Sequence, residues 1–403
     1  MAVSLSGDSE DCDVFVVGAG LAGLAAAIGF ARAGFSVASC GATDRLGEGR
    51  TVTLLGRSID FLEGLDVWRE IEPLAAPLRS LRIIDDTGAL FPPRPVEFHA
   101  DEIGLDAFGW NIENAALADA LAKAAAAPPN LRRIESKVAS FDFAPEGARV
   151  RLADGRRFSA RLVVGADGRG SPARKAAGID VRTHLYPQSA LTVFLAHTRP
   201  HEDYSTEFHT RQGPFTLVPL PATPSARLRS SLVWVMSHAE AARRAALDDE
   251  ALAGEIEAQA RSLLGAMRIE GARGVFPMVR QIVTRLVATR LALVGDAAHA
   301  FPPIGAQGLN LGLRDVKGLI EAAREAAAEG DDIGGAAALE RFSRSRGLDI
   351  ATRTGAVDGL NRSLLAHFGP LDAARGLGLA ALGAIGPLRR LVMREGVAPT
   401  LGR

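Results

Sequence analysis

A short apolar run near the N-terminus leads straight into a glycine-rich turn and then into an alanine-rich stretch. Asp13–Val17 has the composition of a buried strand, and Leu24–Ala33 has that of a helix. Between them Gly18 permits the turn, Gly20 lets the backbone approach a pyrophosphate, and Gly23 lets helix and strand pack closely. This order predicts a dinucleotide-binding α/β fold, with a purely structural glycine turn as the alternative. The predicted contact residues are Gly18, Gly20, Leu21, Ala22 and Gly23.

A second motif follows another apolar run, Leu291–Val294, late in the chain. The residues after it read GDAAHAFPPIGAQGLNLGLRD. The pattern predicts a strand that ends at Gly295 and Asp296, although a Gly-Asp pair after a strand is also common in ordinary turns. A carboxylate at this point can accept hydrogen bonds from a polyol such as a ribityl chain.

The same motif continues as a Pro/Gly loop and then as a helix that begins near Gly308. Free N–H groups in the first turn of that helix face an acceptor or a developing negative charge. A flavin supplies both the polyol and the ring on which such charge develops. The predicted contacts in this motif are Gly295, Asp296, Pro303, Gly305, Gly308, Leu309 and Asn310.

A third motif lies between these two. Leu162–Val164 is typical of a strand and runs into Gly165-Ala-Asp167-Gly168, followed by a helix with Pro172 near its start. Alone, this segment would be a solvated turn, because Asp-Gly pairs are common in turns. Its place between two flavin-like motifs favours Asp167 as a further cofactor contact.

These three motifs, in this order, resemble the single-component FAD-dependent aromatic monooxygenases of the para-hydroxybenzoate hydroxylase fold. Within that group, Gln307–Asp315 and the tract Trp68–Trp110 are most similar to the ubiquinone-biosynthesis hydroxylases. The halogenase pattern W-x-W-x-I-P is absent, since Trp110-Asn-Ile-Glu has neither the second Trp nor the Pro.

The resemblance implies that NADPH reduces FAD, that the reduced flavin reacts with molecular oxygen to a C4a-hydroperoxide, and that this species hydroxylates an aromatic ring. The expected substrate is a polyprenylated phenol in ubiquinone biosynthesis. A soluble hydroxylase of small phenols and a non-catalytic FAD-binding accessory protein are the alternatives. No catalytic side chain is singled out. The resemblance also implies that NADPH docks transiently near Asp167, which fits the absence of a second G-x-G-x-x-G.

The motif order also predicts the domains. The expected fold class is α/β: a discontinuous Rossmann-like FAD-binding domain over 1–73, 102–179 and 277–355, interleaved with a substrate-binding sheet domain over 74–101 and 180–276. The inserts carry strand-like runs separated by Pro and Gly, which is typical of an antiparallel sheet. They are Leu191–Ala196, Tyr204–His209, Phe215–Leu220 and Ser231–Met236.

The contacts to the adenosine half of FAD depart from the usual pattern. Dinucleotide folds end their second strand with Asp or Glu, about 20 residues after the glycines, to bind ribose hydroxyls. Here Gly41 stands at that point, so either Asp44 or Arg45 reaches back or backbone and water hold the ribose. The resemblance also places cofactor contacts at Arg50, which is otherwise a solvated side chain, and at Asn114, expected to be a helix N-cap.

Charge and cysteine content exclude several classes. A net charge of −1 gives no field for nucleic acid. The two cysteines, Cys12 and Cys40, offer no disulfide framework, so a reducing cytoplasm is expected. His197 and His201 have i,i+4 spacing, but Pro200 breaks any helix between them, and no metal site is predicted.

The C-terminal segment, 356–403, is expected to be helical. An apolar stretch over Ala373–Ile385 precedes Arg389, Arg390 and Arg394, which suits a membrane interface. This favours a peripheral membrane enzyme, with membership of a biosynthetic complex as a further expectation. The alternative is that the segment closes the protein's own core or a subunit contact.

Overall fold

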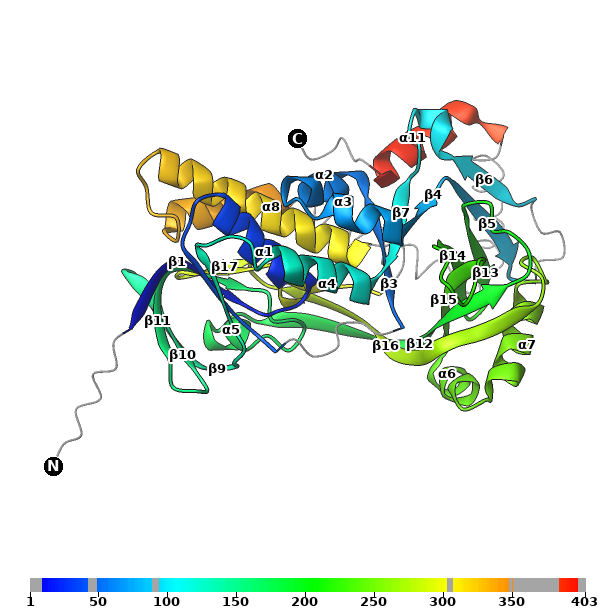
Figure 1. Ribbon diagram of the computed structural model, residues 1–403, viewed down its shortest axis with the longest axis horizontal. Coiled ribbons are helices and arrows are strands. Elements are labelled where there is room, and N and C mark those ends of the chain that lie inside the picture. Colours follow the sequence, from blue (N-terminus) through cyan, green and yellow to red (C-terminus); the bar gives the residue numbers. More distant parts are fainter. Residues whose placement is uncertain are drawn as a thin grey trace.

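Three sheets and the helices around them form the part of the chain that the computed structural model describes: residues 9–42, 49–88, 94–302, 307–347, 350 and 384–397 (Figure 1). The first sheet has the order β17-β18-β11-β1-β2-β8, with β10 joining β11 to β9. Its strands are β1 (Glu10–Val17), β2 (Val37–Cys40), β8 (Leu131–Ile134), β9 (Val138–Ala144), β10 (Gly147–Leu152), β11 (Arg157–Gly165), β17 (Val287–Ala288) and β18 (Leu291–Leu293).

The centre of this first sheet is parallel. β1 pairs in parallel with β2 and β11, and β11 pairs in parallel with β18. Helices α1 (Leu21–Arg32), α4 (Asn114–Ala124) and α8 (Gln307–Ala328) lie over one face (Figure 1). Phe15 of β1, Phe30 of α1 and Leu311 of α8 are fully buried in the shared core. Burial of each such side chain contributes about 1.5–3 kcal/mol, which holds the helices on the sheet.

The second sheet is long and largely antiparallel, in the order β19-β16-β12-β15-β14-β13-β5-β6. Its strands are β5 (Ser80–Asp86), β6 (Val96–His99), β12 (Val181–His197), β13 (Tyr204–Thr210), β14 (Gly213–Leu220), β15 (Arg229–Ser237), β16 (Met267–Val283) and β19 (His299–Ala300). β12 and β16 run from the first lobe to the second (Figure 1). Helices α6 (His238–Ala245) and α7 (Asp249–Gln259) lie at the far end.

A third, three-stranded sheet joins the two larger ones, in the order β3-β7-β4. These strands are β3 (Thr51–Leu55), β7 (Gly109–Glu113) and β4 (Ala75–Leu78). The remaining elements are α2 (Gly56–Gly64), α3 (Trp68–Ile71), α5 (Pro172–Ala176), α11 (Gly386–Val397), a helical stretch over 336–347, and the 3₁₀ turns η1 (Glu72–Leu74), η2 (Ala100–Ile103) and η3 (Gly295–Ala297). The Asn111 side chain donates to the Pro219 carbonyl oxygen at 2.9 Å, which ties the small sheet to the second sheet.

The predicted fold class is confirmed: a parallel-sheet lobe carries the motifs, and antiparallel strands are inserted into it. The four strand-like runs of the inserts fall within β12, β13, β14 and β15. One pairing departs from the antiparallel pattern, because β13 is parallel to β5. The domain bounds stay a prediction, and β16 runs across the one placed at residue 276.

The C-terminal helix α11 rests on η2 and β6. Arg389 forms an ion pair with Glu102 at 2.7 Å, and Met393 packs in a small core with Val96 and Phe98. The predicted apolar stretch before it lies almost entirely outside the described residues. One side of α11 therefore packs against the rest of the protein, as in the alternative in which this segment closes the protein's own core.

Candidate functional site

The three sequence motifs meet at the carboxyl end of the parallel sheet. Gly18 has φ +116°, and a Cβ there would lie 2.2 Å from the Ala166 carbonyl oxygen. A Cβ on Gly295 would lie 3.2 Å from that of Ala22. The glycine loop thus touches both the Asp167 segment and the Gly295 turn. These contacts, between residues more than 100 positions apart, bring all three motifs to one place.

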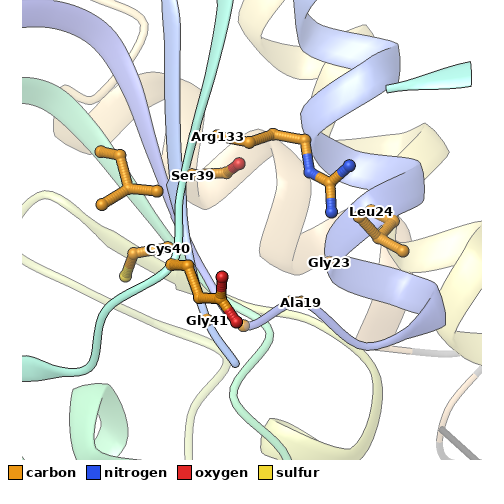
Figure 2. Close-up of a pocket in the computed structure, with 10 residues that line it drawn as sticks. Ala19, Gly23, Leu24, Ser39, Cys40, Gly41 and Arg133 are labelled. Carbon is orange, nitrogen blue, oxygen red and sulfur yellow. The ribbon is translucent and has the colours of Figure 1, made fainter. Parts of the chain in front are cut away.

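A pocket of about 240 Å³ opens beside the glycine loop. Its walls are the loop with the start of α1, the end of β2, and the end of β8 (Figure 2). In dinucleotide folds the adenosine half of the ligand lies beyond these strand ends, with its pyrophosphate at the helix N-terminus. Gly20 is the N-cap of α1, and no described atom lies within 4 Å of where its Cβ would be. Backbone is therefore open to a ligand at this turn.

The turn that carries Asp296 packs against α1 and α8: a Cβ on Gly295 would lie 3.2 Å from the Ala22 Cβ and 3.9 Å from the Gly312 Cα. The Asp296 side chain is exposed within η3. α8 begins at Gln307, so the N–H groups of Gly308, Leu309 and Asn310 belong to its first turn. A ligand held between this carboxylate and the first turn of α8 stays a prediction.

The Asn310 side chain has a structural role that the sequence does not indicate. It is buried, its Oδ1 accepts from the Leu55 backbone N–H at 2.9 Å, and its Nδ2 donates to the Thr53 carbonyl oxygen at 2.7 Å. These bonds fasten the start of α8 to β3. The predicted cofactor contact of Asn310 is therefore one of its backbone N–H and not of its side chain.

Asp315 is the most important residue that sequence reasoning passed over. It is fully buried on α8 and accepts from the Gly295 backbone N–H at 3.1 Å, His299 Nε2 at 2.5 Å and Arg346 Nε at 2.9 Å. Burial alone would raise the pKa of Asp315, but His299 and Arg346 outweigh it and hold that pKa below its usual value. Asp315 therefore anchors the turn that presents Asp296.

Asp167 acts first on its own helix. Its Oδ2 accepts from the Ala173 backbone N–H at 2.9 Å in α5, while its Oδ1 is buried without a partner among the described residues. Burial raises the pKa of Asp167, and hydrogen bonds from Ser171 and Ala173 offset this only in part. The contact between Asp167 and a cofactor stays a prediction.

Asn114 is not the N-cap that was expected. Glu113 holds that position and Asn114 is the first residue of α4, because its backbone N–H bonds to the Arg50 carbonyl oxygen at 2.9 Å and continues the strand pairing. Asn114 Oδ1 is buried and has no partner in the described part of the chain. Arg50 is exposed, and its guanidinium lies 4.9 Å from the centre of the Phe276 ring. The side chain is therefore not simply solvated, and its contact with a cofactor stays a prediction.

Four predicted contact residues fall outside the described residues. They are Asp44, Arg45, Pro303 and Gly305. Their contacts with a cofactor stay predictions.

Covalent attachment of a flavin finds no support in the candidate side chains. Burial raises the pKa of Cys12 and Cys40 to about 12, so both thiols are neutral and poor nucleophiles. His299 is buried, with Nε2 bonded to Asp315. A non-covalent cofactor fits this site.

The residues of the site fit FAD. A pocket stands where the adenosine belongs, an open glycine turn where the pyrophosphate belongs, and an exposed carboxylate beside a helix N-terminus where the ribityl chain and ring belong. Residues 11–346 also match a family described as an FAD binding domain. The chain belongs to the family of FAD-dependent aromatic monooxygenases. FAD is its cofactor, and NAD(P)H is the typical reductant of such enzymes.

Other comparisons agree with this monooxygenase assignment. Ubiquinone hydroxylase UbiL of Rhodospirillum rubrum is 33% identical over 390 residues, covering 95% of this chain and 89% of that protein. The 3-demethoxyubiquinol 3-hydroxylase of Escherichia coli is 29% identical, covering 96% and 98%. The structure of p-nitrophenol 4-monooxygenase PnpA from Pseudomonas putida superposes with a TM-score of 0.78 at 18% identity, covering 96% and 98%. This last likeness concerns the fold.

Two substitutions test the predicted flavin contacts of the monooxygenase. Asp296→Ala removes an exposed carboxylate, and Gly308→Val adds a side chain where no described atom lies within 4 Å. We expect both to leave the unfolding free energy of the FAD-free protein within about 0.5 kcal/mol of the parent. We expect each to weaken FAD binding about tenfold or more, measured by quenching of flavin fluorescence. Unchanged affinity in both variants would show that these positions are structural.

Proposed function

We propose that this monooxygenase hydroxylates the ring of a polyprenylated phenol in ubiquinone biosynthesis, with NADPH as reductant. The pairing of β19 with β16 supports a substrate position between the flavin and the second sheet. Ala300 pairs with Gln281 and His299 with Ile282, so the segment just after Asp296 is a strand of the second sheet. The same few residues therefore hold the flavin and continue into the sheet that would face the substrate. Two relatives are named ubiquinone hydroxylase and 3-demethoxyubiquinol 3-hydroxylase, which supports the substrate class.

The proposed FAD contacts are the residues of the three motifs and their neighbours. These are Gly18, Gly20, Leu21, Ala22, Gly23, Asp44, Arg45, Arg50, Asn114, Asp167, Gly295, Asp296, Pro303, Gly305, Gly308, Leu309 and Asn310. Bound FAD supplies the oxygen chemistry. The first turn of α8 stabilises negative charge on the ring by its dipole and free amides. The Asp315 network keeps the Gly295 turn rigid, so that Asp296 meets the ribityl chain in one position.

A lipid-soluble substrate calls for access to a membrane, and α11 offers a suitable surface. Leu388, Leu391 and Val392 are 38%, 58% and 45% exposed, and Arg390 and Arg394 are exposed on the same helix. Apolar side chains enter the headgroup boundary while guanidinium groups meet lipid phosphates. Among the described residues, no helix is both long and apolar enough to cross a bilayer. We therefore propose peripheral contact at the inner face of the cytoplasmic membrane.

Vesicle flotation tests this contact. We expect Leu391→Asp to reduce the fraction of protein that floats with anionic phosphatidylglycerol vesicles at least threefold, because burial of a leucine at the interface contributes about 1.5–3 kcal/mol. Leu74→Asp is the matched control, since Leu74 is 47% exposed in η1. Equal flotation of the Leu391 variant and the parent would contradict the role of α11. Truncation after Phe368 gives a second test, provided that the shortened protein keeps its flavin.

Metabolite analysis of a deletion strain tests the substrate. We expect loss of ubiquinone and accumulation of a polyprenylated phenol that lacks one hydroxyl, restored by the parent gene but not by the Gly18→Ala variant. Normal ubiquinone in the deletion strain, together with turnover of a small phenol by the purified enzyme, would assign it to small aromatic substrates. Purified protein that neither contains FAD nor takes it up would contradict the enzyme assignment itself.

A further inference from the structure

The position that usually carries the ribose-binding acid cannot hold a side chain in this protein. Gly41 follows the last residue of β2, where dinucleotide folds place Asp or Glu. A Cβ on Gly41 would lie 2.5 Å from the Ala19 backbone nitrogen and 2.8 Å from the Ala19 Cβ. Both atoms belong to the glycine loop, which is bonded to the end of β2 because the Gly18 N–H donates to the Cys40 carbonyl oxygen at 2.8 Å. A carboxylate for the ribose must therefore come from another element.

The end of the neighbouring strand brings a carboxylate to the same place. β2 pairs in parallel with β8, with Cys40 opposite Ile134, and the Gly41 backbone N–H bonds to the Ile134 carbonyl oxygen at 3.3 Å. Glu135 follows Ile134 directly and is exposed. It stands one strand spacing, about 4.8 Å, from the usual position. A glutamate side chain is long enough to cover a distance of that order.

Glu135 also lines the pocket beside the glycine loop, together with Gly41 and Ser39. Ribose hydroxyls bind best to an anionic acceptor, because hydrogen bonds to charged groups are the stronger ones. Among the ten residues that line the pocket, Glu135 alone carries a carboxylate. Arg133 lines the pocket too, but a guanidinium can only donate, and its Nη1 already donates to the Ala122 carbonyl oxygen at 2.9 Å. Figure 2 shows its guanidinium lying between β8 and Leu24 of α1.

We propose that Glu135 binds the adenosine ribose of FAD, in place of the acid that β2 lacks. The acceptor has moved from the end of the second strand to the end of the strand beside it, because the tight approach of Gly41 to Ala19 leaves no space for it on β2. Arg133, two residues before Glu135, lines the same pocket. This inference rests on FAD as the cofactor and is independent of the substrate proposed above.

The test compares FAD with an analogue whose adenosine lacks the 2′ and 3′ hydroxyls, by fluorescence titration of the full-length protein freed of FAD. We expect the parent to bind FAD about tenfold more tightly than the analogue. Glu135→Gln is expected to weaken FAD binding severalfold and to reduce its preference for FAD over the analogue, because the amide keeps one acceptor oxygen but loses the negative charge and the second acceptor oxygen. FMN, which has no adenosine, serves as a ligand whose affinity the substitution should leave unchanged.

Glu146→Gln is the matched control, since Glu146 is an exposed glutamate in the turn between β9 and β10 of the same sheet. It is expected to keep the parent's preference for FAD, and all variants should unfold at the same temperature. A Glu135→Gln protein that keeps the tenfold preference would overturn the proposal. So would loss of the preference in Asp44→Asn, which would assign the ribose to Asp44. If the parent binds no FAD at all, the cofactor assignment falls as well, and that outcome differs from a failure of Glu135 alone.

Discussion

Gly18→Ala is expected to destabilise the folded protein and to abolish FAD binding. The residue has φ +116°, a conformation that costs a non-glycine residue about 1–3 kcal/mol. The new Cβ would also lie 2.2 Å from the Ala166 carbonyl oxygen, so the loop or the Asp167 segment has to move. Overpacking of this kind costs about 1–3 kcal/mol more. Chemical denaturation followed by tryptophan fluorescence and a titration with FAD measure the two effects.

Two other glycines separate strain from ligand contact. Gly20→Ala puts a Cβ where no described atom lies within 4 Å, at φ −71°, so we expect unchanged stability without FAD but at least tenfold weaker FAD binding. Gly254→Ala lies in the middle of α7, away from the site, and should raise stability by about 0.5–1 kcal/mol. If Gly18→Ala and Gly20→Ala have the same stability without FAD, then the positive φ of Gly18 and its contact with Ala166 do not affect the stability of the fold.

Asp315→Ala is expected to cost about 3–5 kcal/mol of unfolding free energy, because it leaves His299 and Arg346 buried beside the space of a lost carboxylate. It also removes the acceptor of the Gly295 N–H, so FAD binding should weaken with stability. Equilibrium denaturation of the FAD-free protein measures the first effect. Asp331→Ala, an exposed aspartate after α8, is the control and should change stability by less than about 0.5 kcal/mol.

The contribution of Asp315 to the free energy of unfolding should decrease as the pH falls. Its pKa in the folded protein is held below the value of about 3.9 that it has in the unfolded chain. Its contribution is therefore fully present above about pH 4 and is lost as pH falls through the folded pKa. The difference in unfolding free energy between the parent and Asp315→Ala should be constant between pH 5 and 7 and shrink at lower pH. A difference that grows on acidification would contradict this assignment.

Elements whose signals are local can be predicted from the sequence. A strand, a glycine turn and a helix succeed one another within about 20 residues, so β1, the Gly18 loop and α1 could be predicted without knowledge of the rest of the chain. The same holds for β18, η3 and α8, and for the alternating runs that became β12 to β15. The family resemblance then followed from the order of three such local patterns.

The distant residues that complete the site follow from the packing of the fold. Asp315 accepts a hydrogen bond from Arg346, 31 positions later, and the Asn310 side chain accepts one from the Leu55 backbone N–H, 255 positions earlier. Asn114 was expected to cap its helix and instead continues a strand pairing with Arg50. Glu135 carries no local motif and stands in the pocket because β8 happens to lie beside β2. The physical reason is common to all four: a hydrogen bond or a steric limit between segments depends on how sheets and helices pack, and no short window of sequence records that packing.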